Sequence, residues 1–372
     1  MPRITLFLCG DVMTGRGIDQ ILPHPCDPAI HEPYMQSALG YVQLAEEKNG
    51  PIPRPVDHSY IWGDAADEFR RVQPNARIIN LETAVTVSEH WVDKGINYRM
   101  NPANVGCVSA AAIDCCVLAN NHVLDWGRPG LIDTLNALHG AGLRTAGAGS
   151  NRLQAQTPAS LPMGAGGHVL VFSLATSSSG VPSDWAATAK DAGVDFLPDL
   201  SPRSVERIAQ RVGSVKRAGD LVVVSIHWGA NWGYDVSAQE SGFARGLLEH
   251  AAVDLVHGHS SHHPKGIEVF RDKLILYGCG DFINDYEGIS GYERFRGDLG
   301  LMYFPTLDVA TGKLLRLELV PTQLMRLRVH RASAPDAGWL CSMLAREGRR
   351  FGTNAELGES GRIELHWRGQ PG

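Results

Sequence analysis

The sequence has no excess of positive charge and no long apolar run. Its 34 lysines and arginines are outnumbered by 40 aspartates and glutamates, so the formal net charge is −6 at pH 7. A nucleic-acid-binding protein needs a basic face to contact phosphates, so we expect no nucleic-acid partner. No apolar run is long enough to cross a bilayer, so we expect no membrane span. The first residues, MPRITLFLCGD, lack the cleavage site of a signal peptide.

The sequence also lacks the pattern of a disulfide framework and the common nucleotide-binding loops. It has seven cysteines, an odd number that includes the adjacent pair Cys115 and Cys116. Most of them lie in apolar runs, so we expect buried, reduced thiols. Neither a Walker-type loop nor a GxGxxG motif is present. With 44% hydrophobic residues the 372-residue chain can bury a large core, and the composition predicts a cytoplasmic globular enzyme.

Six apolar, strand-like runs end in residues that can bind a metal ion. Open α/β sheets bind ligands at the carboxyl ends of their strands. A structural protein has no reason to place Asp, Glu, Asn and His at one strand end after another, whereas an enzyme that gathers ligands at a sheet edge does. The six ends are Gly10-Asp11, Asn80-Leu81-Glu82, Asn120-Asn121-His122, His227-Trp228-Gly229, His257-Gly258-His259-Ser260-Ser261-His262-His263 and Gly278-Cys279-Gly280-Asp281-Phe282.

The densest of these ends is residues 253–263, VDLVHGHSSHH, with four imidazoles in seven residues. Gly258 allows a sharp backbone turn, so side chains two to four residues apart can converge. Neutral imidazole is a good ligand for zinc, manganese or iron. A polar loop with solvated histidines is the ordinary interpretation of one such residue, but four beside a strand end favour a metal site.

The turn after residues 115–119 combines an amide, an imidazole and a carboxylate. The amide oxygen of Asn121 can bind a metal, and the neighbouring His122 can act as a general acid or base that titrates near neutral pH. Asp125 can orient that ring. An Asn-rich turn that caps the helix near Arg128 and Pro129 is the alternative, and one turn can serve both purposes.

Hydrophobic periodicity and turn residues predict alternating strands and helices. The Ser/Gly-rich residues 175–180, with Trp185 and Asp195, are expected to form a flexible rim or lid. An aromatic cluster at Trp228, Trp232 and Tyr234 is either a pocket wall or ordinary packing. Strands are predicted over 4–9, 76–80, 115–119, 143–148, 168–174, 221–226, 253–256, 267–270, 273–277, 299–308, 313–320 and 362–367, and helices over 37–48, 64–72, 102–112, 131–140, 203–217, 238–252 and 335–350.

Between Asp11 and about Phe304, the ordered motifs GDVM…R, NLE, NNH, HWG, GHSSHH and YGCGDF resemble the CapA family of poly-γ-glutamate capsule biosynthesis proteins. That family is similar to the calcineurin-like metallophosphoesterases. The resemblance implies an α/β fold that is a four-layer α/β/β/α sandwich, with two mixed β-sheets face to face and helices outside. The composition changes near residue 332, so we expect a domain over 1–330 and a C-terminal helix and strand extension, 331–372, packed on it.

The metallophosphoesterase pattern implies one or two divalent ions, either Mn, Zn, Fe, Mg or Ca. It implies His122 as the acid near the leaving group. The sequence departs from the pattern at Met13, where a histidine ligand is usual, and at Glu82, where the bridging residue is usually Asp. The last turn leaves His262 or His263 as the final ligand. The ligands implied are Asp11, Glu82, Asn121, His227, His259 and His262.

Three functions remain open from the sequence. The first is a hydrolase of a phosphoester, or of a peptide or polyglutamate-like substrate, using metal-activated water and His122 as general acid. The second is a peptide Cα-epimerase, in which His122 with Asp125, and a GHSSHH histidine with Asp281, exchange a proton. The third is a non-catalytic binder of the anionic polymer in capsule synthesis. We favour the hydrolase, with Arg16 as a further catalytic candidate.

Overall fold

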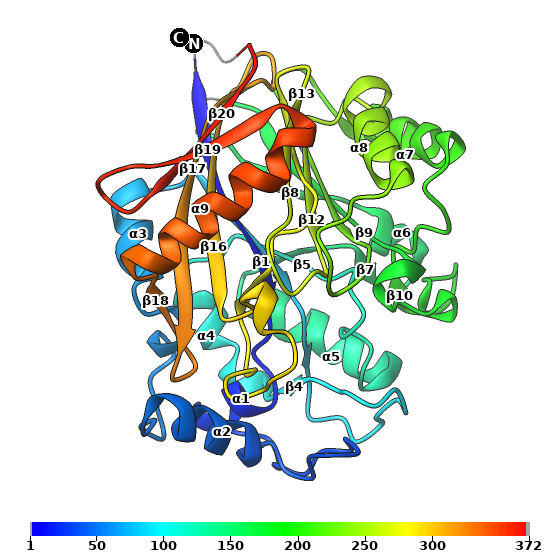
Figure 1. The fold of residues 1–372 in the computed structure, drawn as a ribbon. Coiled ribbons are helices and arrows are strands. Elements are labelled where there is room, and N and C mark those ends of the chain that lie inside the picture. The colour runs from blue at the N-terminus through cyan, green and yellow to red at the C-terminus, as the bar shows by residue number, and fades with distance from the viewer. Residues whose placement is uncertain (1, 165, 370–372) are drawn as a thin grey trace.

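In the computed structural model, which describes residues 2–164 and 166–369, two large mixed β-sheets form the framework (Figure 1). The larger sheet runs in the order β19 (Thr353–Leu357), β20 (Ile363–Trp367), β17 (Leu314–Met325), β16 (Leu299–Asp308), β1 (Arg3–Val12), β2 (Ala76–Leu81), β5 (Cys115–Val117), β6 (Arg144–Ala146). In addition, β15 (Asp281–Ile283) pairs with β1, and β18 (Arg328–Arg331) pairs with β17.

The smaller sheet has six strands, in the order β13 (Ile267–Phe270), β14 (Lys273–Leu276), β12 (Leu255–His259), β11 (Leu221–His227), β9 (His168–Ala175), β8 (Ala159–Pro162). Its central strand β11 reads LVVVSIH, and all seven residues are buried. A continuous apolar run of this kind is typical of a strand covered on both faces. Two short sheets pair β10 (Gly193–Val194) with β7 (Ala148–Gly149), and β3 (Ala84–Val85) with β4 (Arg99–Met100).

The two large sheets share one apolar core. Side chains alternate along a strand, so Leu6 and Leu8 of β1 pack with Val223 of β11 between the sheets. The intervening Phe7 points to the opposite face of the larger sheet, and Val224 to the opposite face of the smaller sheet. Each sheet is therefore buried on both faces.

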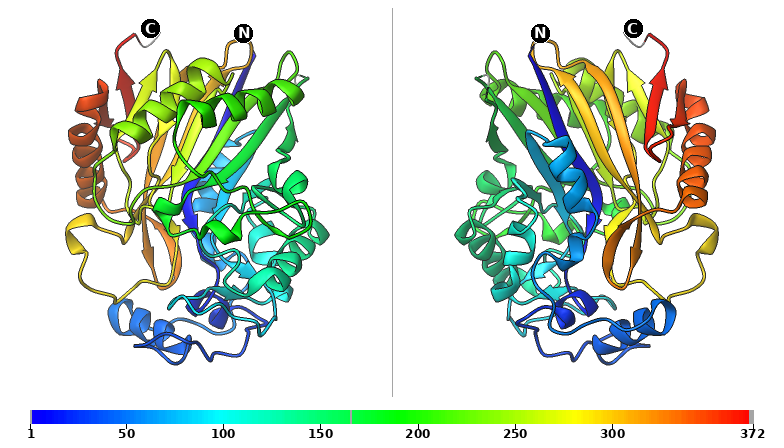
Figure 2. Two further views of the ribbon diagram at one scale, coloured as in Figure 1. Left: turned by 90° about the vertical axis from the view of Figure 1, so that its right-hand side faces the viewer. Right: turned by 90° about the vertical axis from the view of Figure 1, so that its left-hand side faces the viewer.

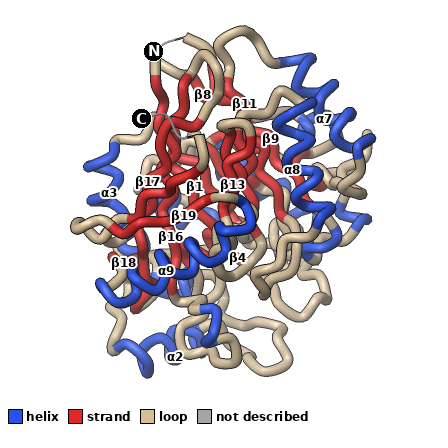
Figure 3. The backbone as a smooth tube through the Cα atoms, turned by 45° about the horizontal axis from the view of Figure 1, so that its top comes forward, coloured by secondary structure: helices blue, strands red, loops and turns tan. Residues whose placement is uncertain are grey.

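Helices cover the outer faces and one open edge. Figure 2 shows α7 (Pro202–Val215) and α8 (Ala238–His250) over the smaller sheet, with α3 (Ala65–Val72) over the larger one. The long helix α9 (Ala334–Gly348) contacts the edge strands β13 and β19 (Figures 1 and 3). Its Leu340 and Leu344 belong to the core between the sheets. The other helices are α1 (Gly17–Ile21), α2 (Leu39–Asn49), α4 (Gly106–Ser109), α5 (Gly127–Gly140) and α6 (Arg152–Gln156), with short 3-10 helices at Tyr60–Trp62, Pro102–Asn104, Ser177–Ser179, Ser183–Trp185, Glu293–Phe295 and Arg349–Phe351.

Local sequence explains where the outer helices begin. Helix α8 starts at a capping box in which the Ser237 side chain accepts from Glu240 N–H, and the Glu240 side chain accepts from Ser237 N–H. Helix α7 starts with Ser201 as cap and Pro202 in the first turn, where a missing N–H has no cost. These caps fix the ends of the helices that cover the smaller sheet.

The structure confirms the expected α/β fold with mixed sheets and outer helices, and it corrects two local predictions. The helix predicted over 102–112 is a 3-10 turn followed by the short α4, and the chain then reverses at Ala112, whose φ is 48°. The segment expected to be a flexible lid is packed, because Trp185 and Asp195 are buried and β10 pairs with β7. All seven cysteines are free thiols, as predicted. Of the helices described, none has the length and apolar character needed to cross a membrane.

Candidate metal centre

The carboxyl end of β1 lies between those of β2 and β15. All three strands run parallel, and Asp11 is opposite Asn80 of β2 and Asp281 of β15. Glu82 follows directly after β2. Parallel neighbours end at the same edge of a sheet, so the larger sheet gathers three buried carboxylates, Asp11, Glu82 and Asp281, at one place.

The smaller sheet supplies imidazoles to the same place. Strands β11 and β12 are parallel, with Ser225 opposite His257 and His227 opposite His259. Alternate residues share a face, so these four residues lie on the face that carries the core between the sheets. His259 Nδ1 lies 3.9 Å from Asp11 Oδ1, and this contact joins the two sheets.

Two groups of possible ligands share Asp11. One comprises Asp11, His227 and His259, and the other comprises Asp11, His262 and Asp281. Within each group, one ligand atom of every residue lies within 4.8 Å of the others, and all five residues are buried. Asp281 was expected from sequence to support a catalytic imidazole, whereas its position makes it a candidate ligand.

Asp11 and Glu82 fit a divalent cation, because in the described part of the chain neither carboxylate forms an ion pair with a lysine or arginine. Asp11 Oδ2 is buried and has no hydrogen-bond partner among the described residues. Burial and the nearby Asp281 raise the pKa of Asp11 to about 7, and burial and Asp11 raise the pKa of Glu82 well above its ordinary value. Asn80 Nδ2 donates to Asp11 Oδ1 at 2.7 Å and to Glu82 Oε2 at 2.9 Å, which holds the two carboxylates side by side. Two buried carboxylates held together in this way either take up a proton or bind a cation.

A chain of hydrogen bonds sets the tautomer of His259. The Cys9 carbonyl can only accept, so His257 Nε2, 2.7 Å away, carries the proton. Burial lowers the pKa of His257 to about 4, so its Nδ1 is an acceptor, and Ser225 Oγ donates to it at 3.1 Å. The Ser225 oxygen then accepts from His259 Nε2 at 2.8 Å. His259 Nδ1 is left as a lone pair that faces the candidate centre.

The two contacts of the His227 ring also favour a bound cation. Burial lowers its pKa well below the ordinary value, so the ring is neutral and has one N–H. Its Nδ1 lies 2.7 Å from His259 Nδ1, and its Nε2 lies 2.9 Å from Asn121 Oδ1. Both of these partners are acceptors, so one of the two contacts brings lone pairs together. A cation accepts electron pairs from such neighbours, and the donor set therefore fits a metal.

His122 forms a separate unit with Asp125 beside the ligand groups. Its Nδ1 donates to Asp125 Oδ2 at 2.7 Å, and Lys94 Nζ donates to Asp125 Oδ1 at 2.6 Å. The ring packs 4.0 Å from that of Tyr98, whose N–H also donates to Asp125. His122 Nε2 is then the open nitrogen, 3.9 Å from Glu82 Oε1.

The expectation that His122 titrates near neutral pH is wrong. Burial lowers its pKa to about 4, because the ring is enclosed by the protein and Lys94 adds a nearby positive charge, although Asp125 acts in the opposite direction. At neutral pH the ring is therefore uncharged, with its Nε2 lone pair directed to the centre. This arrangement can accept a proton before it donates one.

Only two of the four histidines in the 257–263 segment face the centre. His257 belongs to the hydrogen-bond chain described above. His263 accepts from Gly233 N–H at 3.0 Å and donates to the Pro264 carbonyl at 3.0 Å, so both of its nitrogens are occupied by backbone. His262 Nδ1 instead lies 3.0 Å from Asp281 Oδ1. Burial alone would lower the pKa of His262, but the Asp281 carboxylate outweighs it and raises the pKa.

Arg16 lies beside the centre but its charge is already engaged. Its Nη1 donates to Glu32 Oε1 at 2.8 Å, and its Nε donates to Asp285 Oδ2 at 3.1 Å. The guanidinium lies 3.8 Å from the ring centre of Tyr41. Arg16 therefore ties the segments around the centre together, and both carboxylates must be displaced before it could contact a substrate.

Access to the centre is from the side of His122 and His262, whose side chains are 9% and 12% exposed. The Trp232 ring lies 5.3 Å from that of His262 and stacks on Tyr292 at 4.1 Å. Trp228 is buried and belongs to the apolar core under α8. Of the three aromatic residues in the predicted cluster, Trp232 thus lies at the entrance, Trp228 lies in the core, and Tyr234 packs against the His263 ring at 4.6 Å.

Three residues at the centre were missed in the sequence. Ser225 could have been found, because it lies two residues before His227 on the same face of β11. Lys94 and Tyr98 lie in the irregular segment before β4, which has no periodicity and no motif. Their roles depend on contacts with Asp125 that only the fold creates.

The chain is similar to known bacterial proteins over most of its length. Residues 5–286 match the sequence model of the family described as bacterial capsule synthesis protein PGA_cap. A probable polyglutamine synthesis accessory protein of Mycobacterium tuberculosis is 47% identical over 351 residues, covering 94% of this chain and 92% of the relative. Capsule biosynthesis protein CapA of Bacillus anthracis is 27% identical over 86% of this chain and 67% of its own length. PGA biosynthesis protein CapA of Bacillus subtilis is 28% identical over 84% of this chain and 69% of its own length.

Proposed function

Because this chain belongs to the bacterial capsule synthesis protein family, we propose that it is a divalent-metal-dependent hydrolase serving glutamate-polymer synthesis. Its substrate would be an amide or phosphoester bond in a polyglutamate-like molecule, since two relatives are named for polyglutamine synthesis and for PGA biosynthesis. We further propose that the two sheets and their helices form the four-layer sandwich of the metallophosphoesterases. The observation that carries the functional proposal is the pair of ligand groups sharing Asp11, beside the His122–Asp125 unit.

The proposed ligands combine carboxylate, imidazole and amide donors. Asp11, His227 and His259, with the Asn121 amide, would hold one cation, and Asp11, His262 and Asp281 would hold a second. Glu82 would lie beside the first group, since its Oε1 is 3.8 Å from His227 Nε2. This mixture suits manganese, zinc or iron. The cation would supply Lewis acidity and lower the pKa of a bound water.

His122 would transfer the proton. Asp125 holds the ring in the tautomer that leaves Nε2 open, and Lys94 and Tyr98 hold Asp125 in turn. The neutral ring would accept a proton at Nε2 from the attacking group and return it to the leaving group. Burial of the site excludes bulk water from this exchange.

A peptide Cα-epimerase is the second candidate. It is supported by two carboxylate-bound imidazoles at the same centre, His122 with Asp125 at 2.7 Å and His262 with Asp281 at 3.0 Å. The two reactions can be separated by incubating γ-glutamyl peptides with the protein in deuterated water. Cleavage products would support hydrolysis, and deuterium at an uncleaved Cα would support epimerisation. Binding of polyglutamate with neither product would leave a binding role in polymer synthesis.

Removing the metal should lower both stability and turnover. A cation present at a hundred times its dissociation constant stabilises the fold by about 2.7 kcal/mol, so chelation should lower the melting temperature by a few degrees. Elemental analysis before and after dialysis against a chelator, with calorimetry on each sample, tests this. Returning Mn or Zn should restore both properties. The proposal is refuted if the protein never contains a divalent ion and its melting temperature changes with neither chelator nor added metal.

Ser225→Ala should weaken metal binding although Ser225 contacts no metal. Without its hydroxyl, nothing fixes the proton on His259 Nε2, and the loss of such a supporting contact typically lowers metal affinity about 10- to 100-fold. Ser173→Ala is the matched control, because Ser173 is a buried strand serine directly opposite Ser225 and contacts only Ala119 N–H. Metal affinity can be measured by competition with a fluorescent chelator. Equal affinities in the two variants would show that the hydrogen-bond chain has no such role.

A further inference from the structure

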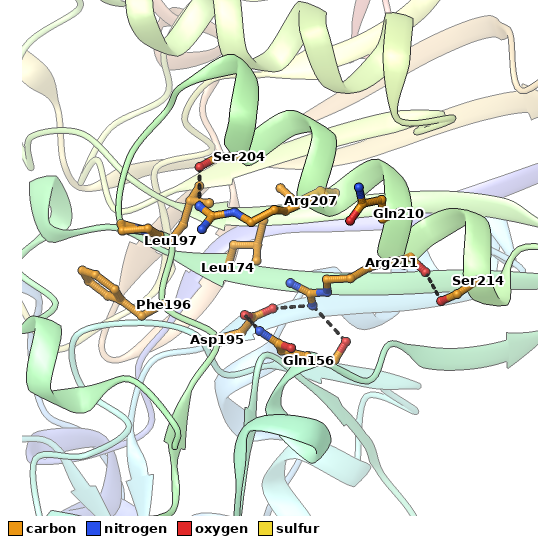
Figure 4. A pocket seen from close by; sticks show the side chains of 12 residues that line it. Gln156, Leu174, Asp195, Phe196, Leu197, Ser204, Arg207, Gln210, Arg211 and Ser214 are labelled. Atoms are coloured by element: carbon orange, nitrogen blue, oxygen red, sulfur yellow. Dashed lines mark hydrogen bonds and ion pairs between the residues drawn. The ribbon is translucent and has the colours of Figure 1, made fainter. Parts of the chain in front are cut away.

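A hollow lies on the outer face of the smaller sheet, which is the face away from the metal centre, between α7 and the segment 195–198. Its volume is about 420 Å³, and an adjoining hollow of about 300 Å³ shares Gln156, Asp195 and Arg207 with it (Figure 4). No residue of the candidate metal centre lines either hollow.

Strand alternation separates this hollow from the metal centre. Leu174 of β9 lines the hollow and packs with Ile208 of α7 in the outer core. The preceding residue, Ser173, points to the opposite face, where it contacts Ala119 N–H of the larger sheet. Ser225, its neighbour on β11, belongs to the hydrogen-bond chain behind His259. A molecule in the outer hollow is thus separated from the metal ligands by the thickness of the sheet.

Three guanidinium groups line the two hollows, and only one of them is neutralised there. Arg211 donates to Asp195 Oδ2 at 2.5 Å and to the Gln156 carbonyl at 2.9 Å. Arg207 donates to Ser204 Oγ at 2.7 Å, and Arg152 donates to the Ala187 carbonyl at 3.4 Å. In the described part of the chain, neither Arg207 nor Arg152 forms an ion pair with a carboxylate, and both are exposed to solvent.

The hollow also has an apolar wall. Figure 4 shows Arg207 and Arg211 extending from one face of α7 toward the segment that carries Asp195 and Phe196. Phe196 and Leu197 form the apolar part of the lining. Three guanidinium groups therefore line two hollows that contain one carboxylate, Asp195, with Asp199 near Arg207, in a protein whose formal net charge is −6.

We propose that this hollow is a binding site for a small organic anion. Its carboxylate or phosphate group would be held by the exposed guanidinium groups of Arg207 and Arg152, and its carbon chain would lie against Phe196 and Leu197. Guanidinium groups bind either oxyanion through paired N–H donors. The site is independent of the hydrolase proposal, because no proposed ligand or proton-transfer residue lines it.

Calorimetric titration of the full-length protein with glutarate and with inorganic phosphate tests the site. We expect saturable binding that weakens as salt concentration rises. Arg207→Gln should weaken it roughly tenfold to a hundredfold, since one charge-assisted hydrogen bond is lost. Arg203→Gln is the matched control, because Arg203 lies one turn earlier on α7 and does not line the hollow. A preference for glutarate would identify a carboxylate ligand, and a preference for phosphate a phosphorylated one.

Three results would overturn the proposal, and the first two come from the titrations just described. One is the absence of binding by either anion at millimolar concentration, and the other is equal binding by Arg207→Gln and Arg203→Gln. Titration of the chelated protein distinguishes this site from the metal centre, where phosphate could also bind. Binding that survives chelation but is lost in Arg207→Gln supports the outer site. Binding that disappears on chelation assigns the anion to the metal centre and refutes the outer site.

Discussion

Asp11→Asn should remove the metal from both ligand groups and reduce turnover by roughly three orders of magnitude or more. Asp11 is the one residue common to the two groups, so its loss leaves each with two members. Metal ions contribute several kcal/mol to transition-state stabilisation, and each 1.36 kcal/mol corresponds to a factor of ten in rate. Metal content by elemental analysis and turnover on the cleaved substrate measure the two effects.

The same variant should fold at least as well as the metal-free wild-type protein. Asparagine keeps the shape and the oxygen that accepts from Asn80 Nδ2, and it removes one of the like charges beside Asp281. Asp19→Asn is a matched control, because Asp19 is also fully buried but accepts only from Cys26, Asn101 and Asn104. That variant should lose stability and retain metal. Full metal content in Asp11→Asn would contradict the assignment of the centre.

The strand ends are what the sequence reveals most reliably about the centre. Asp11, His227 and His259 each close an apolar run, and parallel pairing then places their strand ends together. The residue types at those ends are therefore visible without knowledge of the fold. What is not visible is that the two strand sets belong to different sheets, because hydrophobic periodicity is the same in one large sheet and in two. The expectation of two sheets came from the ordered motifs, through their resemblance to the CapA family, and not from hydrophobic periodicity.

The roles of individual histidines could not be read from the sequence. His257 and His263 lie in the same short segment as His259 and His262, and nothing in the sequence separates the two pairs. In the structure, however, His257 is held by the Cys9 carbonyl, and His263 is held by Gly233 N–H and the Pro264 carbonyl. Cys9 lies 248 residues away along the chain. Such long-range contacts, and the burial that lowers the pKa of His122, arise only when the sheets pack.

His122→Ala should retain the metal and the fold but lower turnover by about a hundred- to ten-thousand-fold. The ring contacts Asp125, Lys94 and Tyr98 and belongs to neither ligand group, so its removal leaves both groups intact. The expected loss is the usual contribution of one general acid or base. Turnover number, Michaelis constant and metal content should be measured together, because loss of proton transfer lowers turnover without a comparable change in substrate binding.

His259→Ala is the contrasting variant in this experiment. Its Nδ1 lone pair faces the centre and its removal should empty a ligand group, so this variant should lose metal as well as turnover. If His122→Ala also loses the metal, His122 is a ligand and the division of roles is wrong. If His122→Ala keeps full turnover on the true substrate, proton transfer occurs elsewhere. A binding role would be favoured if wild type and His122→Ala both bind the polymer tightly and neither turns it over. The buried His122–Asp125 pair would then have only a structural role.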